Sequence, residues 1–216
     1  MKLIVWNKYL VGQIVYRSVD PPIKNEVDEV FTAPLKCEEP VDVVFMVDGS
    51  DSVSAKDWPM LLKWTNNLID QISPQDREYS SSAVFQQFSR DPVTGEIPDA
   101  IIGQFAPKDE DSVNDFKDQV INTIQSAQGT NTYESLNKVF SEPDGLYYTL
   151  PTFTGVQPDG ETIDGATVFI TLSDGESRDR DSQRDQAVVD KLKKLSRMQI
   201  AVGVGKSYNK AELARL

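Results

Sequence analysis

VDVVFMVDGSDS, residues 41–52, is the stretch that decides the fold. Its first half, residues 43–47, is apolar without a break, which is typical of a strand buried on both faces at the centre of a parallel sheet. In open α/β sheets, ligands bind in the crevice at the carboxyl ends of the strands. Asp48, Ser50 and Ser52 stand there at alternate positions and offer the hard oxygen atoms that Mg²⁺ prefers. The same residues also suit a polar strand-to-helix turn with serine as the helix cap.

The composition fits one α/β domain with an appendage. The chain has 216 residues, and 39% of them are hydrophobic, which is enough for a sizeable core. The formal net charge is -12, from 34 acidic and 22 basic residues. A chain this acidic is a poor partner for nucleic acid or for an anionic membrane surface, so we expect neither as a partner.

Absent and rare residue types exclude several kinds of chemistry. The sequence has no histidine, which excludes Ser-His-Asp and Cys-His catalysis and histidine-ligated zinc. Cys37 is the single cysteine and cannot form an internal disulfide, so cysteine usage does not fix the compartment. No run of about 20 apolar residues occurs, so we expect no transmembrane helix and no membrane insertion.

The chain divides at about residue 40. Residues 1–39 form an N-terminal extension with possible strands at 3–6 and 10–16, paired through Asn7-Lys8, followed by a Pro-rich linker. From residue 40 onward, apolar strands alternate with amphipathic helices. This alternation predicts a doubly wound, mostly parallel, Rossmann-like sheet flanked by helices. The strands expected at 78–89 and 100–105 form a hairpin, so one edge strand is antiparallel.

Apolar periodicity and capping residues place the helices. One helix follows Asp57, its expected N-cap, with Pro59 in the first turn. A second opens at Ser112 and turns Ile121 and Ile124 inward, and a third spans residues 133–140. Further helices are expected around 187–195, with Ala187, Val188, Leu192 and Leu195 buried, and from residue 211. Residues 142–164 form a long irregular loop, which is usually functional or mobile.

Two further segments carry oxygen ligands of the same kind. Thr130 lies in a polar turn, GTNT, at residues 129–132, and Asp174 lies in SDGE, directly after another continuous apolar strand. If these segments and the turn at Asp48 lie side by side at one sheet edge, they supply two carboxylates and three hydroxyl groups. Neutral hydroxyl groups leave a divalent cation partly unneutralised, so it still attracts an anionic ligand.

The three segments, in this order, resemble the von Willebrand factor A domain with its metal-ion-dependent adhesion site. Asp48, Ser50 and Ser52 match the Asp-x-Ser-x-Ser motif of its first loop, and Thr130 and Asp174 match the second and third loops. The resemblance covers residues 40–216 and is greatest for extracellular-matrix and integrin-inserted members.

This resemblance implies a metal-dependent adhesion module, not an enzyme. Ser50 and Ser52 would hold Mg²⁺ or Mn²⁺, with Ca²⁺ as a further candidate. Thr130 would contact the cation directly in a ligand-ready state, and Asp48 and Asp174 partly through water. The partner would be a collagen, another matrix protein or a receptor that supplies a Glu or Asp carboxylate. The setting would be extracellular.

The chain departs from the family pattern in three respects. The usual last strand and helix are missing, so either the sequence stops early or the N-terminal strands occupy their place. Cys37 stands where matrix members often have a paired cysteine, but its partner is absent. The loop at 142–164 is longer than usual and is a candidate part of the recognition face. Near the site, we expect Asp51 and Glu176 to be solvated and Asn131 and Thr132 to brace their loop.

Three other functions fit parts of this pattern. An intracellular von Willebrand factor A scaffold would use the same site to dock a partner in an ATPase or chelatase-type assembly, in the cytoplasm. An aspartate-based phosphatase would use Asp48 as phosphoryl acceptor, but it needs an acidic residue two positions later, where Ser50 stands. A purely structural domain would keep the motif without using it.

Overall fold

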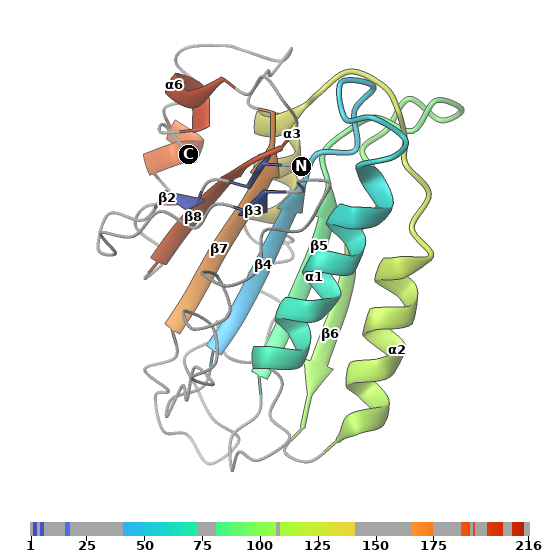
Figure 1. Cartoon of the computed structure of the whole chain (residues 1–216), viewed down its shortest axis with the longest axis vertical. Coiled ribbons are helices and arrows are strands. Elements are labelled where there is room, and N and C mark those ends of the chain that lie inside the picture. The colour runs from blue at the N-terminus through green and yellow to red at the C-terminus, as the bar shows by residue number, and fades with distance from the viewer. Residues whose placement is uncertain are drawn as a thin grey trace.

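The strand β4 (Val41–Val47) lies at the centre of the main sheet and pairs in parallel with β5 (Ser81–Gln87) and β7 (Ala166–Ser173) (Figure 1). The computed structural model describes residues 2–3, 5–6, 16–17, 41–72, 81–106, 109–140, 166–174, 187–190, 192, 198–204 and 209–213. Among these, the sheet has six strands in the order β2–β8–β7–β4–β5–β6. This arrangement confirms the predicted mostly parallel α/β fold.

Both edge strands of this sheet are antiparallel to their neighbours. On one side β6 (Ile101–Phe105) pairs with β5, as the predicted hairpin requires. On the other side β8 (Met198–Gly203) is parallel to β7, and the short β2 (Val5–Trp6) lies antiparallel to β8. The sequence predicted one antiparallel edge strand, and β2 adds a second.

The expected pairing of the N-terminal strands is found in part. Trp6 pairs with Ala201 of β8, and the expected turn at Asn7-Lys8 lies outside the described residues. Leu3 and Tyr16, one from each of the two expected strands, do pair antiparallel, as β1 (Lys2–Leu3) and β3 (Tyr16–Arg17) in a separate two-stranded sheet.

Alternate side chains of β4 pack into two cores, one on each face of the sheet. Val43, Phe45 and Val47 lie in a cluster with residues of α1 (Trp58–Ile72) and α2 (Glu110–Ile121). Val44 and Met46 pack on the other face, with residues of α3 (Thr132–Phe140). Because each such side chain contributes about 1.5–3 kcal/mol when fully buried, this strand anchors both layers.

The helices begin and end close to the predicted positions, with one clear error. α1 begins after Asp57, whose carbonyl oxygen accepts the first helical hydrogen bond from Leu61, at 3.0 Å. α2 is capped by Asp109, whose Oδ1 accepts from the Ser112 amide at 3.1 Å, so the helix starts before Ser112 and the prediction of its cap was wrong.

The inward positions predicted for the end of α2 were also wrong. This helix ends at Ile121, with Asn122 as its C-cap. Ile121, its last residue, is 41% exposed, and Ile124, beyond the helix, is 87% exposed.

The last helices are described in part. Residues 187–190 and 192 are helical, with Val189 and Leu192 buried and Ala187 exposed, so burial of Ala187 was wrongly predicted. α6 (Lys210–Leu213) ends the described chain. The linker with Cys37, the loop at 142–164, Glu176 and Leu195 lie outside the described residues. No helix among the described residues is long and apolar enough to cross a bilayer.

A buried carboxyl group lies at the start of β4, where its side chain belongs to a polar row. Asp42 is almost fully buried and pairs in register with Ser82 on one side and Thr167 on the other, both of which are buried. The hydroxyl group of Ser82 donates to its Oδ1. Burial raises the pKa of Asp42 from 3.8 to about 6, and the hydrogen bonds from Ser82 oppose this rise.

The raised pKa of Asp42 predicts a loss of stability as the pH rises. A carboxyl group with a raised native pKa favours folding below its unfolded pKa, and this contribution disappears as pH rises through about 6. We expect Asp42→Asn to lack this loss, so that its unfolding free energy relative to the wild type rises by about 1.4 kcal/mol between pH 5 and 8. Urea denaturation of both proteins at each pH, with chelator present, measures this difference in unfolding free energy. Parallel pH profiles of the two proteins would contradict the assignment.

Candidate metal centre

The oxygen-rich residues gather where the strand order of the sheet reverses. From β4 the chain runs outward through β5 and β6, and it then returns to β7 and β8 on the other side. The connections after β4 and β7 therefore diverge and leave room for a ligand at the carboxyl ends of these strands, at the top of Figure 1. The Asp48 amide donates to the Leu172 carbonyl oxygen at 2.8 Å, which places the two loops side by side.

The first loop, residues 48–57, folds tightly around the Asp48 carboxylate. Asp48 is fully buried, its Oδ1 accepts from the Ser50 amide at 3.0 Å, and its Oδ2 accepts from the Ser173 hydroxyl at 2.8 Å. The hydroxyl oxygens of Ser50 and Ser52 lie 2.6 Å apart. Ser50 is buried and Ser52 is exposed, so this pair of hydroxyl groups runs from the interior to the surface.

Burial and a second carboxylate both act on Asp48. Burial is the larger cause and raises its pKa from 3.8 to about 6; the hydrogen bond from Ser50 opposes this, and the charge of Asp174 raises the pKa further. Asp174, which directly follows β7, is itself buried. The two carboxylates predicted to share a site are thus close enough to repel each other, and no cation among the described residues contributes to the shift.

The second loop, residues 122–131, is hydrogen-bonded to the first loop at several points. The Ala127 amide donates to the Gly49 carbonyl oxygen at 2.8 Å, and the Asp51 amide donates to the Gln128 carbonyl oxygen at 3.1 Å. Nε2 of Gln125 donates to the carbonyl oxygens of Ser50 and Val53, at 2.8 Å each. These bonds hold the second loop, which carries Thr130, against the first loop.

Thr130 is anchored on its other side by the end of β5. It is buried and forms an isolated antiparallel bridge with Ser89. Asn131 donates from Nδ2 to Oε2 of Glu134 at 3.3 Å, a contact that fits its expected bracing role. Asp51 is exposed, in agreement with the expectation for its side chain. The structure therefore places all five predicted site residues on three loops at one end of the sheet.

Several residues that support the loops were missed by the sequence analysis. Ser173 could have been found, because the parallel register of Val47 with Leu172 places the next residue of β7 beside Asp48. Gln87 and Gln125 belong to no motif. Gln87 accepts from the Ser126 amide at 2.9 Å and donates to the Ile124 carbonyl oxygen at 3.2 Å, contacts that depend on the path of the second loop.

The donor set fits a hard divalent cation. The charge of Asp174 raises the cost of ionising the buried Asp48 carboxyl group, and a cation between their loops would offset this cost. Hydroxyl and carboxylate oxygens are ligands for Mg²⁺, Mn²⁺ and Ca²⁺. The described residues contain no cluster of three or more His, Cys, Asp or Glu side chains that could hold a metal, so this mixed set is the candidate there.

Known proteins with this pattern share the fold. The family model of the von Willebrand factor type A domain matches residues 42–216. Matrilin-1 of Mus musculus is 27% identical over 173 residues, which make up 76% of this chain and 28% of Matrilin-1. The chain thus spans less than a third of that relative.

Solved structures agree at the level of the fold. Proximal thread matrix protein 1 from the mussel byssus, in a structure with a zinc-occupied MIDAS motif, aligns with a TM-score of 0.58 and 18% identity over 83% of this chain and 41% of its own. A von Willebrand factor type A protein from Catenulispora acidiphila aligns with a TM-score of 0.53 and 15% identity, over 82% of this chain and 36% of its own.

The packing at Gly49 predicts a sensitive position in the first loop. A Cβ atom there would lie 1.7 Å from Oε1 and 2.4 Å from Cδ of Gln87. We expect Gly49→Ala to displace Gln87 from the Ser126 amide and to lower the unfolding free energy by about 1–3 kcal/mol.

Denaturant unfolding of Gly49→Ala with chelator present measures this effect. A second variant, Gly49→Ala with Gln87→Ala, restores the space and should recover part of the stability. An unchanged unfolding midpoint in Gly49→Ala would contradict the packing around the first loop.

Proposed function

The chain belongs to the von Willebrand factor type A domain family, and we propose that it is a metal-dependent protein-binding module of the adhesion type. The observation that carries this proposal is the buried carboxylate pair of Asp48 and Asp174, beside the paired hydroxyl groups of Ser50 and Ser52. Such a group of oxygen ligands costs stability unless a cation neutralises it.

Each residue has a distinct part in holding the cation. Ser50 and Ser52 present two neutral oxygens that extend to the surface. Asp48 supplies charge from the interior, with its orientation fixed by Ser173. Thr130 and Asp174 complete the set from the second and third loops. When bound, the cation supplies a positive site for a carboxylate of a protein partner.

We assign the site to Mg²⁺ or Mn²⁺, with Ca²⁺ as a weaker candidate. Two carboxylates and three hydroxyl groups suit a small, hard cation that retains water, whereas Ca²⁺ usually takes more oxygen ligands. The zinc in the MIDAS motif of the mussel protein supports a divalent cation in this fold.

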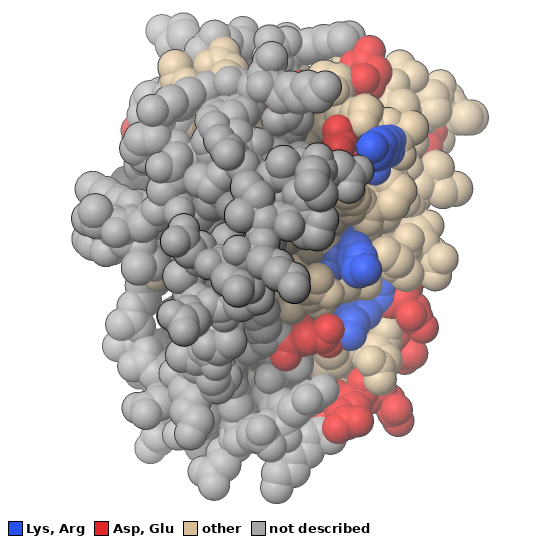
Figure 2. Space-filling view, in the orientation of Figure 1, with Lys and Arg blue, Asp and Glu red and all other residues tan. Residues whose placement is uncertain are grey.

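The partner in this proposal is a matrix or cell-surface protein that presents a Glu or Asp side chain. The similarity to Matrilin-1 supports an extracellular setting over an intracellular assembly. Figure 2 shows basic and acidic side chains intermingled on the described part of one face, which lacks the broad basic surface that nucleic acid requires. The proposal assigns no enzymatic activity, because the buried position of Asp48 suits an anchor for a cation and not an attacking nucleophile.

Binding of the cation should stabilise the native protein. A ligand that binds only the native state stabilises by about 2.7 kcal/mol at a hundredfold excess over its Kd. For a domain of this size we expect Mg²⁺ or Mn²⁺ at such an excess to raise the Tm by roughly 5–10 °C relative to chelator. Asp174→Ala should keep its melting transition in chelator and lose this rise. Equal melting of the wild type with and without both metals, up to millimolar concentrations, would contradict the proposal.

The effect of the metal should also depend on pH. Because the native pKa of Asp48 is about 6 without metal, protons compete with the cation below that pH. We expect the metal-induced rise in Tm to be small at pH 5 and to grow as pH increases to 7.5. Differential scanning calorimetry at matched ionic strength measures both values. A rise of equal size at the two pH values would show that protons on Asp48 do not compete with the cation.

A further inference from the structure

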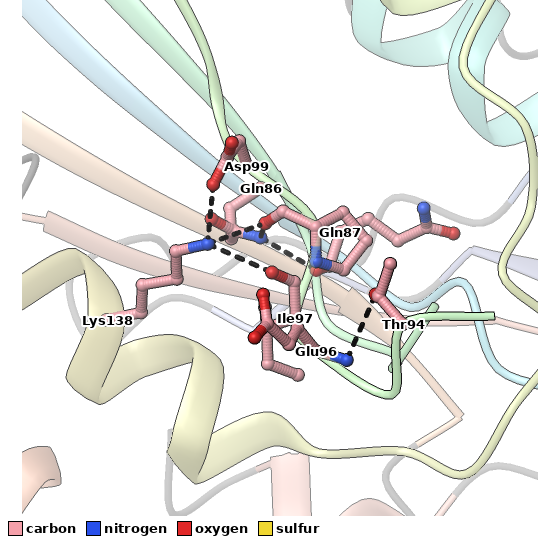
Figure 3. Close-up of polar contacts among 8 residues, drawn as sticks. Gln86, Gln87, Thr94, Glu96, Ile97, Asp99 and Lys138 are labelled. Atoms are coloured by element: carbon pink, nitrogen blue, oxygen red, sulfur yellow. Dashed lines mark hydrogen bonds and ion pairs between the residues drawn. The ribbon is translucent and has the colours of Figure 1, made fainter. Parts of the chain in front are cut away.

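The connection between β5 and β6, residues 88–100, is tied to α3 at two points. At the first, Nζ of Lys138 donates to the Ile97 carbonyl oxygen at 2.9 Å and pairs with Oδ1 of Asp99 at 2.8 Å (Figure 3). Gln86 on β5 donates from Nε2 to the Pro98 carbonyl oxygen at 2.9 Å. This end of the connection is therefore held between α3 and the sheet.

The second point joins Arg90 to the first turn of α3. Nη2 of Arg90 lies 2.7 Å from both carboxylate oxygens of Glu134, and Nη1 donates to the Gly95 carbonyl oxygen. Oε2 of Glu134 also accepts from Nδ2 of Asn131 at 3.3 Å. Because Asn131 directly follows Thr130, the ion pair acts one residue away from a candidate metal ligand.

The residue before Arg90 contacts the same loop directly. Ser89 is fully buried and forms the antiparallel bridge to Thr130. Its hydroxyl oxygen accepts from the Gln128 amide at 3.1 Å. Thr130 is thus enclosed by a closed ring of contacts on the side opposite the first loop. The ring runs from the end of β5 through the ion pair with Glu134 and the bond from Asn131 back to Thr130.

We propose that Arg90 and Glu134 are positioning residues that hold Thr130 in its place for the cation, an inference that rests on the proposed function. The ion pair fixes the first turn of α3 relative to the end of β5. Thr130 stands between these two points, so loss of the pair releases one side of the ring. The bonds from Ala127 and Gln128 to the first loop then remain as the other constraint on the second loop.

A second ion pair provides the matched control. Lys117 of α2 pairs with Asp70 of α1. Asp70 lies near the end of α1, whereas the first metal-site loop precedes the start of that helix. The side chains of this second pair are 23% and 49% exposed, against 44% and 40% for Arg90 and Glu134. Exposed pairs of this kind each contribute little to global stability, so the two pairs should differ in their effect on the site and not in their effect on unfolding.

The test measures Mn²⁺ affinity by isothermal titration calorimetry, and unfolding in chelator, for the full chain. We expect Arg90→Gln and Glu134→Gln to raise the Kd for Mn²⁺ by about three- to tenfold, and Lys117→Gln to change it by less than about twofold. The unfolding midpoints in chelator should fall by similar amounts in all three. Exchange of the charges, Arg90→Glu with Glu134→Arg, should recover most of the affinity.

The titrations distinguish a failure of this inference from a failure of the proposed function. An unchanged Kd in Arg90→Gln, an equal loss in Lys117→Gln, or no recovery on charge exchange would overturn the positioning role while the wild type still binds Mn²⁺. A wild-type chain that binds neither Mn²⁺ nor Mg²⁺ would overturn the proposed function and this inference with it.

Discussion

The burial of two carboxylates at one edge of the sheet is the constraint on which the other features of the site depend. Asp48 is fully buried at the end of the central strand, and Asp174 follows the neighbouring strand. Hydrogen bonds from Ser50 and Ser173 offset part of the cost, but they leave the pKa of Asp48 at about 6. A folded domain retains such a pair at neutral pH most readily when a cation offsets the charge.

The rest of the fold serves to hold three loops against this pair. The central strand is apolar on both faces, so it is fixed between two cores and delivers Asp48 to a defined place. Gln125 and Gln87 join the second loop to the first loop and to β5 through side-chain bonds to the backbone. Ser89 bridges to Thr130 from the opposite side. The site is thus a product of contacts between loops, supported by a rigid sheet.

The sequence predicted those features that depend on local pattern. The unbroken apolar run at 43–47 identified the central strand, and the polar residues after it identified the candidate ligands. The cap of α2 was missed because Asp109 and Ser112 are both good caps and the choice between them depends on where the chain meets the sheet. The exposure of Ile124 and the supporting role of Gln87 follow from the path of the second loop, which no local pattern encodes. The metal and the partner stay predictions.

The most direct test of the metal assignment is a crystal structure of the full chain grown with Mn²⁺, with anomalous scattering recorded to locate the ion. We expect an anomalous peak between the three loops, within bonding distance of the hydroxyl oxygens of Ser50 and Ser52. The absence of a peak there at saturating Mn²⁺, with the three loops ordered, would contradict it.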